Sequence, residues 1–98
     1  DAARILDVLI ELLNKYPEMY IEIDAHTDSR ATATYNLMLS DRRAKATLEY
    51  LVKNGINRNR LKSKGYGESQ PLIECGKTRI CTEQEHSINR RCEFIILK

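Results

Sequence analysis

The pattern of hydrophobic and polar positions changes its period near the middle of the chain. Residues 20–25 (YIEIDA) alternate between apolar and polar side chains, which predicts a strand buried on one face. Residues 26–30 (HTDSR) interrupt this alternation with turn and capping residues. Residues 33–54 follow a helical period, and Gly55 is well placed to end the helix in a left-handed conformation. We therefore expect a strand, a polar turn and a long helix in this order.

The flanking segments complete an alternation of helices and strands. Residues 2–16 predict an amphipathic helix that Pro17 ends, and residues 61–66 predict a short strand. Thr82 and Glu85 form a capping box for a short helix that ends near Asn89. Residues 91–97 read as a last strand, central in the sheet or covered on both faces because its apolar residues are consecutive. The first helix is expected to bury one face, made of Ala2, Ile5, Leu6, Leu9, Leu13 and Tyr16. This order predicts an α+β fold, a two-layer sandwich with two main helices on one face of a small mixed sheet.

The long helix carries polar side chains on one side. Asn36, Ser40 and Arg43 are spaced so that they share this side, whereas Arg42 is rotated by about 100° from Arg43. An adjacent stripe is expected to face the core, and it consists of Leu37, Ala44, Leu48 and Leu51.

Asp28 lies just past the end of the predicted strand, and Arg43 lies on the helix that follows. A carboxylate and a guanidinium in this arrangement suit a ligand that carries both an ammonium and a carboxylate. The alternative interpretation is that Asp28 caps the helix and Arg43 is a solvated surface charge, because exposed ion pairs are common and weak.

Four segments together resemble a known family. HTDSR, YNLMLSDRRA, LKSKGYGESQP and NRRCEFII occur in the order found in the OmpA-like peptidoglycan-binding domain of Gram-negative envelope proteins. The same domain type occurs in peptidoglycan-associated lipoproteins and in flagellar stator proteins, and the resemblance covers residues 2–97.

The resemblance implies non-covalent binding of diaminopimelate in the stem peptide of the cell wall. The Asp of HTD and the Arg of LSxxRA, which are Asp28 and Arg43 here, would make this contact. Family patterns also place Thr27, Asn36 and Arg90 around the pocket. A domain of this kind would anchor an outer-membrane or envelope protein to peptidoglycan from the periplasm, without a cofactor. A protein–protein interaction domain of the same fold is the alternative.

The chain departs from the family pattern at two places. Residues 29–31 (SRA) contain no glycine, whereas family members usually have one in this turn, so the turn must form without a free left-handed residue. The chain also begins directly at the predicted first helix, so the first strand of the family and the loop after it are expected to be absent. An unpaired sheet edge, which is a possible site of homodimerisation, would then result.

Composition fits one soluble globular domain spanning residues 1–98, with 42% hydrophobic and 31% charged residues. No apolar run approaches the roughly 20 residues that span a bilayer. No signal peptide precedes Asp1, so the sequence reads as an excised domain that does not show its own targeting. The net charge of +2 does not by itself indicate nucleic-acid binding. A basic run at residues 58–64 is better explained as a solvated edge, because no aromatic residues interleave within it.

The three cysteines differ in their surroundings. Cys75 and Cys81 bracket a short polar loop, and a disulfide between them would suit an oxidising periplasm. Cys92 lies in an apolar strand pattern and is expected to be a small buried side chain. Two alternatives are reduced structural thiols and a zinc site with His86, which would lack a fourth ligand.

The titratable residues favour binding over catalysis. His26 and Asp28 are close in sequence, but no serine or cysteine nucleophile has a plausible place beside His26. The sequence shows neither a paired-carboxylate pattern nor a metal-ligand pattern. We expect a binding module rather than an enzyme.

Overall fold

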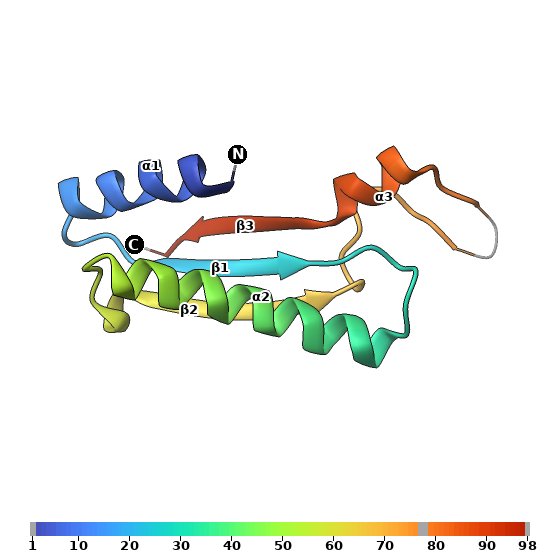
Figure 1. Ribbon diagram of the computed structural model, residues 1–98, viewed down its shortest axis with the longest axis horizontal. Coiled ribbons are helices and arrows are strands. Elements are labelled where there is room, and N and C mark those ends of the chain that lie inside the picture. Colours follow the sequence, from blue (N-terminus) through green and yellow to red (C-terminus); the bar gives the residue numbers. More distant parts are fainter. Residues whose placement is uncertain (1, 77–78, 98) are drawn as a thin grey trace.

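The computed structural model describes residues 2–76 and 79–97. Figure 1 shows helices and strands that alternate along the chain in the predicted order. Each observed boundary lies within one or two residues of its prediction. The elements are α1 (Ala2–Lys15), β1 (Ile21–His26), α2 (Ala33–Lys53), a short 3₁₀ turn (Arg58–Arg60), β2 (Leu61–Gly67), α3 (Glu83–Asn89) and β3 (Arg91–Ile96).

The sheet is mixed, with strand order β2-β1-β3. β1 runs parallel to β2, so α2 forms the crossover between them, and β1 runs antiparallel to β3. The carboxyl ends of β1 and β2 therefore meet the start of β3 at one end of the sheet (Figure 1, right). This topology gathers the residues after β1, the residues after β2 and the residue before β3 at a single edge.

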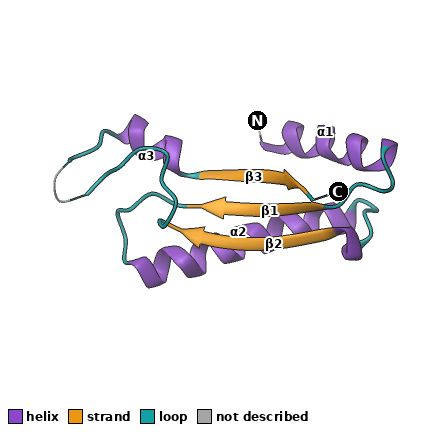
Figure 2. Cartoon of the chain, turned by 180° about the vertical axis from the view of Figure 1, so that it is seen from behind, coloured by secondary structure: helices purple, strands orange, loops and turns teal. Residues whose placement is uncertain are grey.

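The helical layer covers one face of the sheet. Figure 2, seen from behind, shows α2 beyond the strands, lying across β1 and β2. The core between the two layers contains Leu13, Ile21, Ile23, Ala25, Ala44, Leu48, Leu51, Ile56 and Leu61. These observations confirm the predicted two-layer α+β architecture.

The buried side of α2 differs from the prediction. Leu37 is 51% exposed, whereas Asn36 and Ser40 are buried with Ala44 and Leu48. The contact follows an i, i+4 row, which winds around a helix by about 40° at each step, so Leu37 lies beside the row and not on it.

A glycine in β2 explains why the buried row of α2 carries a small polar side chain at Ser40. A Cβ atom on Gly65 of β2 would lie 2.3 Å from the backbone nitrogen of Asp41, so helix and strand backbones touch there. Ser40 fits in this narrow space, and its Oγ accepts a hydrogen bond from the backbone N–H of Gly67 at 2.8 Å. A leucine would be too large for the same position.

β1 is buried on both faces, contrary to the prediction of one buried face. Asp24 and His26 point away from the helical layer but are nevertheless buried. The His26 ring stacks on Tyr66 with centroids 5.2 Å apart, and His26 Nε2 lies 3.1 Å from Glu93 Oε1. β1 is the central strand, so long side chains from β2 and β3 cover its polar face.

β3 was expected to be central or covered on both faces, and this was wrong. Among the described residues it pairs only with β1, and Ile95, Ile96 and Leu97 are exposed. Cys92 is exposed for the same reason, rather than being a small buried side chain. The run of apolar residues thus marks an edge strand with an uncovered apolar surface.

The first helix also differs from its predicted buried face. Ile5 and Tyr16 are exposed, whereas Leu13 is fully buried and Leu6, Leu9 and Ile10 pack partly against the core.

Two residues of the basic run have structural partners. Arg60 donates hydrogen bonds to the backbone carbonyls of Leu13, Tyr16 and Met19, at the end of α1 and just beyond it. Arg58 forms an ion pair with Glu49. These arginines join elements of the fold.

Candidate functional site

The turn after β1 is held by hydrogen bonds instead of a glycine. No non-glycine residue with a positive φ occurs in the described part of the chain. The backbone N–H of Thr27 donates to Gly67 O at 2.9 Å, and Asn36 Nδ2 donates to Asp28 O at 3.1 Å and to Glu68 Oε1 at 2.9 Å. Thr32 then caps α2 by accepting from the N–H of Tyr35. Thr27 and Asn36, both predicted site residues, therefore support the loop that carries Asp28.

Asp28 lies at the centre of a group of donors and is only 9% exposed. Its Oδ1 accepts from the backbone N–H of Arg30 at 3.1 Å. Its Oδ2 accepts from Arg30 Nη2 at 2.9 Å and from Arg90 Nη1 at 2.8 Å. Burial alone would raise the pKa of Asp28, but the hydrogen bonds from Arg30 and Arg90 outweigh it and hold the pKa well below its ordinary value. The carboxylate is therefore charged at every physiological pH.

Glu83 accepts hydrogen bonds from the same two arginines, through the guanidinium nitrogens that do not contact Asp28 Oδ2. Arg30 Nη1 donates to Glu83 Oε2 at 2.7 Å, and Arg90 Nη2 donates to Glu83 Oε1 at 2.6 Å. Asp28, Arg30, Glu83 and Arg90 thus close a ring of alternating charge, which we call the four-residue ring. Sequence reasoning had identified Asp28 and Arg90 but had missed Arg30 and Glu83.

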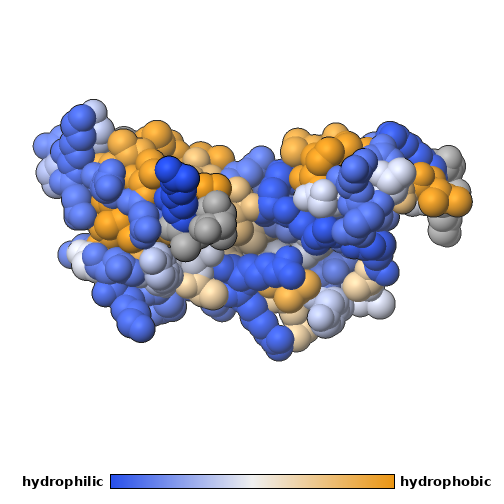
Figure 3. Space-filling model, turned by 45° about the horizontal axis from the view of Figure 1, so that its top comes forward, coloured by the Kyte–Doolittle hydropathy of each residue, from blue (hydrophilic) through white to orange (hydrophobic). Residues whose placement is uncertain are grey.

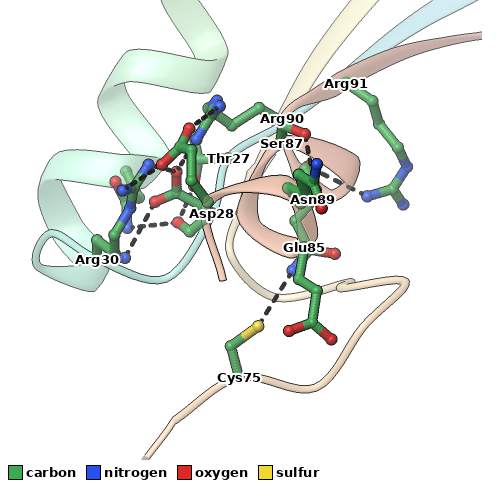
Figure 4. A network of polar contacts seen from close by, with 12 residues as sticks. Thr27, Asp28, Arg30, Cys75, Glu85, Ser87, Asn89, Arg90 and Arg91 are labelled. Carbon is green, nitrogen blue, oxygen red and sulfur yellow. Dashed lines mark hydrogen bonds and ion pairs between the residues drawn. The ribbon is translucent and has the colours of Figure 1, made fainter. Parts of the chain in front are cut away.

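The end of α3 sets the position of Arg90. Asn89 is fully buried, accepts from the backbone N–H groups of Leu72 and Ile73, and donates to Ile73 O at 2.9 Å. Figure 4 shows Arg90 turned toward Asp28, whereas Asn89 points toward the loop that contains Cys75. Asn89 therefore fastens this loop to the helix end from which Arg90 extends.

The same loop carries the disulfide. Cys75 and Cys81 are bonded, with Cα atoms 5.6 Å apart, as their spacing suggested. The bond occupies the two thiols that the alternative zinc site would have required.

Arg43 lies apart from the four-residue ring. It is exposed and forms no ion pair among the described residues. It lines a hollow of about 160 Å³ together with Ala25, His26, Arg90, Arg91 and Cys92. The structure therefore does not bring Arg43 into contact with Asp28, but it places Arg43 and the Asp28-bound Arg90 around the same space.

Comparison with known proteins identifies the family. A model of the OmpA family matches residues 1–85. The chain belongs to the OmpA family.

Individual members of this family match over much of the chain. The peptidoglycan-associated lipoprotein of Rhizobium meliloti (strain 1021) is 44% identical over 75 residues, which is 76% of this chain and 43% of that protein. Outer membrane porin F of Pseudomonas fluorescens is 38% identical over 85 residues, which is 87% of this chain and 24% of that protein. The chain thus spans less than half the length of these relatives.

Solved structures of relatives share the fold. The peptidoglycan-associated lipoprotein from Burkholderia pseudomallei matches with a TM-score of 0.83 and 26% identity, over 95% of this chain and 75% of that one. A putative MotB-like protein from Desulfovibrio vulgaris matches with a TM-score of 0.79 and 30% identity, over 97% of this chain and 60% of that one. The three-stranded mixed sheet and its helices are thus the OmpA-like architecture.

Proposed function

We propose that this domain binds peptidoglycan through the free amino-acid end of diaminopimelate, and that it thereby anchors an envelope protein to the cell wall from the periplasm. The names of its relatives include peptidoglycan-associated lipoproteins and an outer membrane porin, which supports this setting. The disulfide suits an oxidising compartment. No helix in the described residues is long and apolar enough to cross a membrane.

One observation carries the proposal. The ionised carboxylate of Asp28 is bound to Arg90. Arg90 lines a hollow together with Arg43, which forms no ion pair with any residue that the structure describes. The distal centre of diaminopimelate carries an ammonium and a carboxylate on one carbon atom. Asp28 would accept from the ammonium, while Arg43 and Arg90 would donate to the carboxylate. Thr27 and Asn36 would hold the loop that presents Asp28, because their described contacts are with the backbone and Glu68.

The decisive experiment compares two neighbouring arginines. Arg43→Ala should weaken binding of a diaminopimelate-containing peptide by about 2 kcal/mol or more, because the ligand carboxylate would lose a charged partner. Arg43→Lys should also weaken binding, since an ammonium cannot make two parallel hydrogen bonds. Arg42→Ala is the matched control, because Arg42 is also exposed but does not line the hollow. Calorimetry measures all three.

Cosedimentation with purified sacculi, with and without free diaminopimelate as competitor, tests the function as a whole. Wild-type protein should pellet with sacculi, and free diaminopimelate should release it. Loss of binding in Arg42→Ala together with intact binding in Arg43→Ala would contradict the assigned helix face.

An apolar surface favours a second candidate function, a protein–protein interaction domain of the same fold. Figure 3 shows hydrophobic side chains gathered on the side of α1. Ile5, Val8 and Leu12 of this helix are exposed, and a hollow of about 280 Å³ between α1, α2 and β3 is lined by Ile5, Leu6, Thr47, Cys92 and Phe94. Exposed apolar patches mark interaction sites in many soluble proteins. A domain with only this function would remain in the supernatant of the sacculus experiment.

A further inference from the structure

The acceptor assigned to the ligand is already occupied in the free protein. Asp28 accepts three hydrogen bonds from Arg30 and Arg90, and little of the residue is exposed. A carboxylate offers about four lone-pair sites. Oδ1 keeps one free site, but Oδ2 already accepts from both guanidinium groups, so an ammonium that binds Oδ2 must displace one of them.

Arg30 is the group that can leave. Its side chain is 50% exposed, compared with 30% for Arg90. Arg90 also lines the hollow assigned to the ligand carboxylate, so its departure would remove a donor that the ligand needs. Arg30 lines no part of that hollow. Its backbone N–H can keep its bond to Asp28 Oδ1 while the guanidinium moves.

Glu83 gives the displaced guanidinium a second partner. Arg30 Nη1 already donates to Glu83 at 2.7 Å, so Arg30 can give up Asp28 Oδ2 and remain paired. The four-residue ring contains two negative and two positive side chains, and a zwitterionic ligand leaves this balance unchanged. A ligand that carries only an ammonium would add an uncompensated positive charge next to Arg30, Arg90 and Arg43.

We propose that Arg30 is a specificity-determining residue that competes with the ligand ammonium for Asp28, and that it moves onto Glu83 when a zwitterionic ligand binds. This inference rests on the proposed function. The competition weakens binding of every ligand that places an ammonium on Asp28 Oδ2. It disfavours a simple amine further, because the displaced Arg30 stays close and repels a charge that no ligand carboxylate balances.

Calorimetry with two peptides tests this role. One peptide carries diaminopimelate, and the other carries lysine at the same position, which provides an ammonium without the adjoining carboxylate. Arg30→Gln should lower the Kd for the diaminopimelate peptide roughly two- to fivefold, the range for releasing one partly exposed ion pair. It should lower the Kd for the lysine peptide by a larger factor. Arg30→Lys, which keeps the charge, should stay close to wild type.

Arg42→Gln is the matched control, since it removes the same charge from an exposed arginine that lines no part of the hollow. It should leave both Kd values unchanged. If Arg30→Gln weakens binding of the diaminopimelate peptide, Arg30 holds Asp28 ready for the ligand and the competition is refuted. An equal effect of Arg42→Gln and Arg30→Gln would assign the change to net charge and would also refute it.

A second measurement separates this inference from the proposed function. Carboxyl NMR titration of Asp28 without ligand should show a higher pKa in Arg30→Gln, because one of the two guanidinium groups is gone. An unchanged pKa would refute the ion pair on which the competition depends. If neither wild type nor Arg30→Gln binds the diaminopimelate peptide while the pKa rises, the proposed function has failed and the competition for a ligand fails with it. If wild type binds and Arg30→Gln binds less tightly, only the role of Arg30 is lost.

Discussion

Two carboxylates on one short segment, Asp24 and Asp28, have opposite electrostatic surroundings. Asp24 lies in the centre of β1, on the face turned away from the helices, opposite Lys64 on β2 and Glu93 on β3. Asp28 lies four residues later, where the arginines of the four-residue ring converge on it. Both residues are largely buried. Burial by itself therefore does not distinguish them, and the charges of their neighbours do.

The pKa values express this contrast. Burial raises the pKa of Asp24 to about 6, with further contributions from Glu22 and Glu93, while Lys64 opposes them. Asp24 Oδ1 has no hydrogen-bond partner within the part of the chain that the structure describes. The pKa of Asp28 is instead held far below its ordinary value by its two arginines. Near pH 6, Asp24 is partly protonated and Asp28 is fully ionised.

The comparison distinguishes a carboxylate that can serve a charged ligand from one that cannot. A binding site needs a charge that persists at every working pH, and the four-residue ring provides it at Asp28. Asp24 lies among carboxylates on the sheet face turned away from the helices, and it destabilises the folded state when it is ionised. Three substitutions would break or sharpen this contrast.

The largest effect is expected at Asp28. Asp28→Asn should lower the free energy of unfolding at pH 7 by roughly 2 kcal/mol, because Arg30 and Arg90 lose the negative charge of their common partner and keep, among the described residues, only that of Glu83. The same change should abolish measurable binding of a diaminopimelate peptide. Urea denaturation and calorimetry measure the two effects. A folded and fully stable Asp28→Asn protein that still binds the peptide would remove the basis of the comparison.

A change of opposite sign is expected at Asp24. The pKa of Asp24 is about 6 in the folded state and near 3.8 in the unfolded state, so the folded state binds the proton more tightly. The protein therefore loses stability as the pH rises from about 4 to about 6. Asp24→Asn should therefore raise the free energy of unfolding at pH 7 by about 1–2 kcal/mol, a gain that disappears toward pH 4.

The control for Asp24 is the difference between variant and wild type at each pH. His26 has a pKa lowered by burial and by Arg91, so its protonation destabilises the folded protein as the pH falls below about 6.5. In the wild type this effect opposes the gain in stability that protonation of Asp24 brings. Subtracting the wild-type free energy of unfolding from that of Asp24→Asn at each pH cancels the contribution of His26, which both proteins share. A difference that is independent of pH would contradict the raised pKa.

The sequence predicted the fold more fully than the site. Period and capping located the three α-helices and three strands of the described residues, because the alternation along β1 and the capping box of α3 follow local rules. The buried row of α2 was misplaced at Leu37, since the close approach of Gly65 to Asp41 depends on how helix and strand cross. The edge position of β3 also escaped prediction, because strand order is a property of the whole sheet.

The ring around Asp28 could be predicted only in part. The resemblance indicated Asp28 and Arg90, but Glu83 lies 53 residues after Arg30 and no local pattern joins them. HTDSR offered one signal, a guanidinium two residues after the carboxylate, which is close enough to reach back to it. Arg43 stays a predicted ligand contact that the four-residue ring does not include.

The smallest expected effect concerns the neighbours of Asp24. Glu22 raises the pKa of Asp24 through a side-chain hydrogen bond and through charge repulsion, but less than burial does. Glu22→Gln should therefore lower the pKa of Asp24 by less than one unit, which corresponds to less than about 1.4 kcal/mol. Glu18→Gln, which removes an exposed carboxylate before β1, is the matched control and should leave that pKa unchanged. Carboxyl NMR titration of Asp24 measures both variants. If Glu22→Gln left the pKa of Asp24 near 6, Glu22 would play no part in the shift, and the raised pKa of Asp24 would rest on burial and on the charge of Glu93.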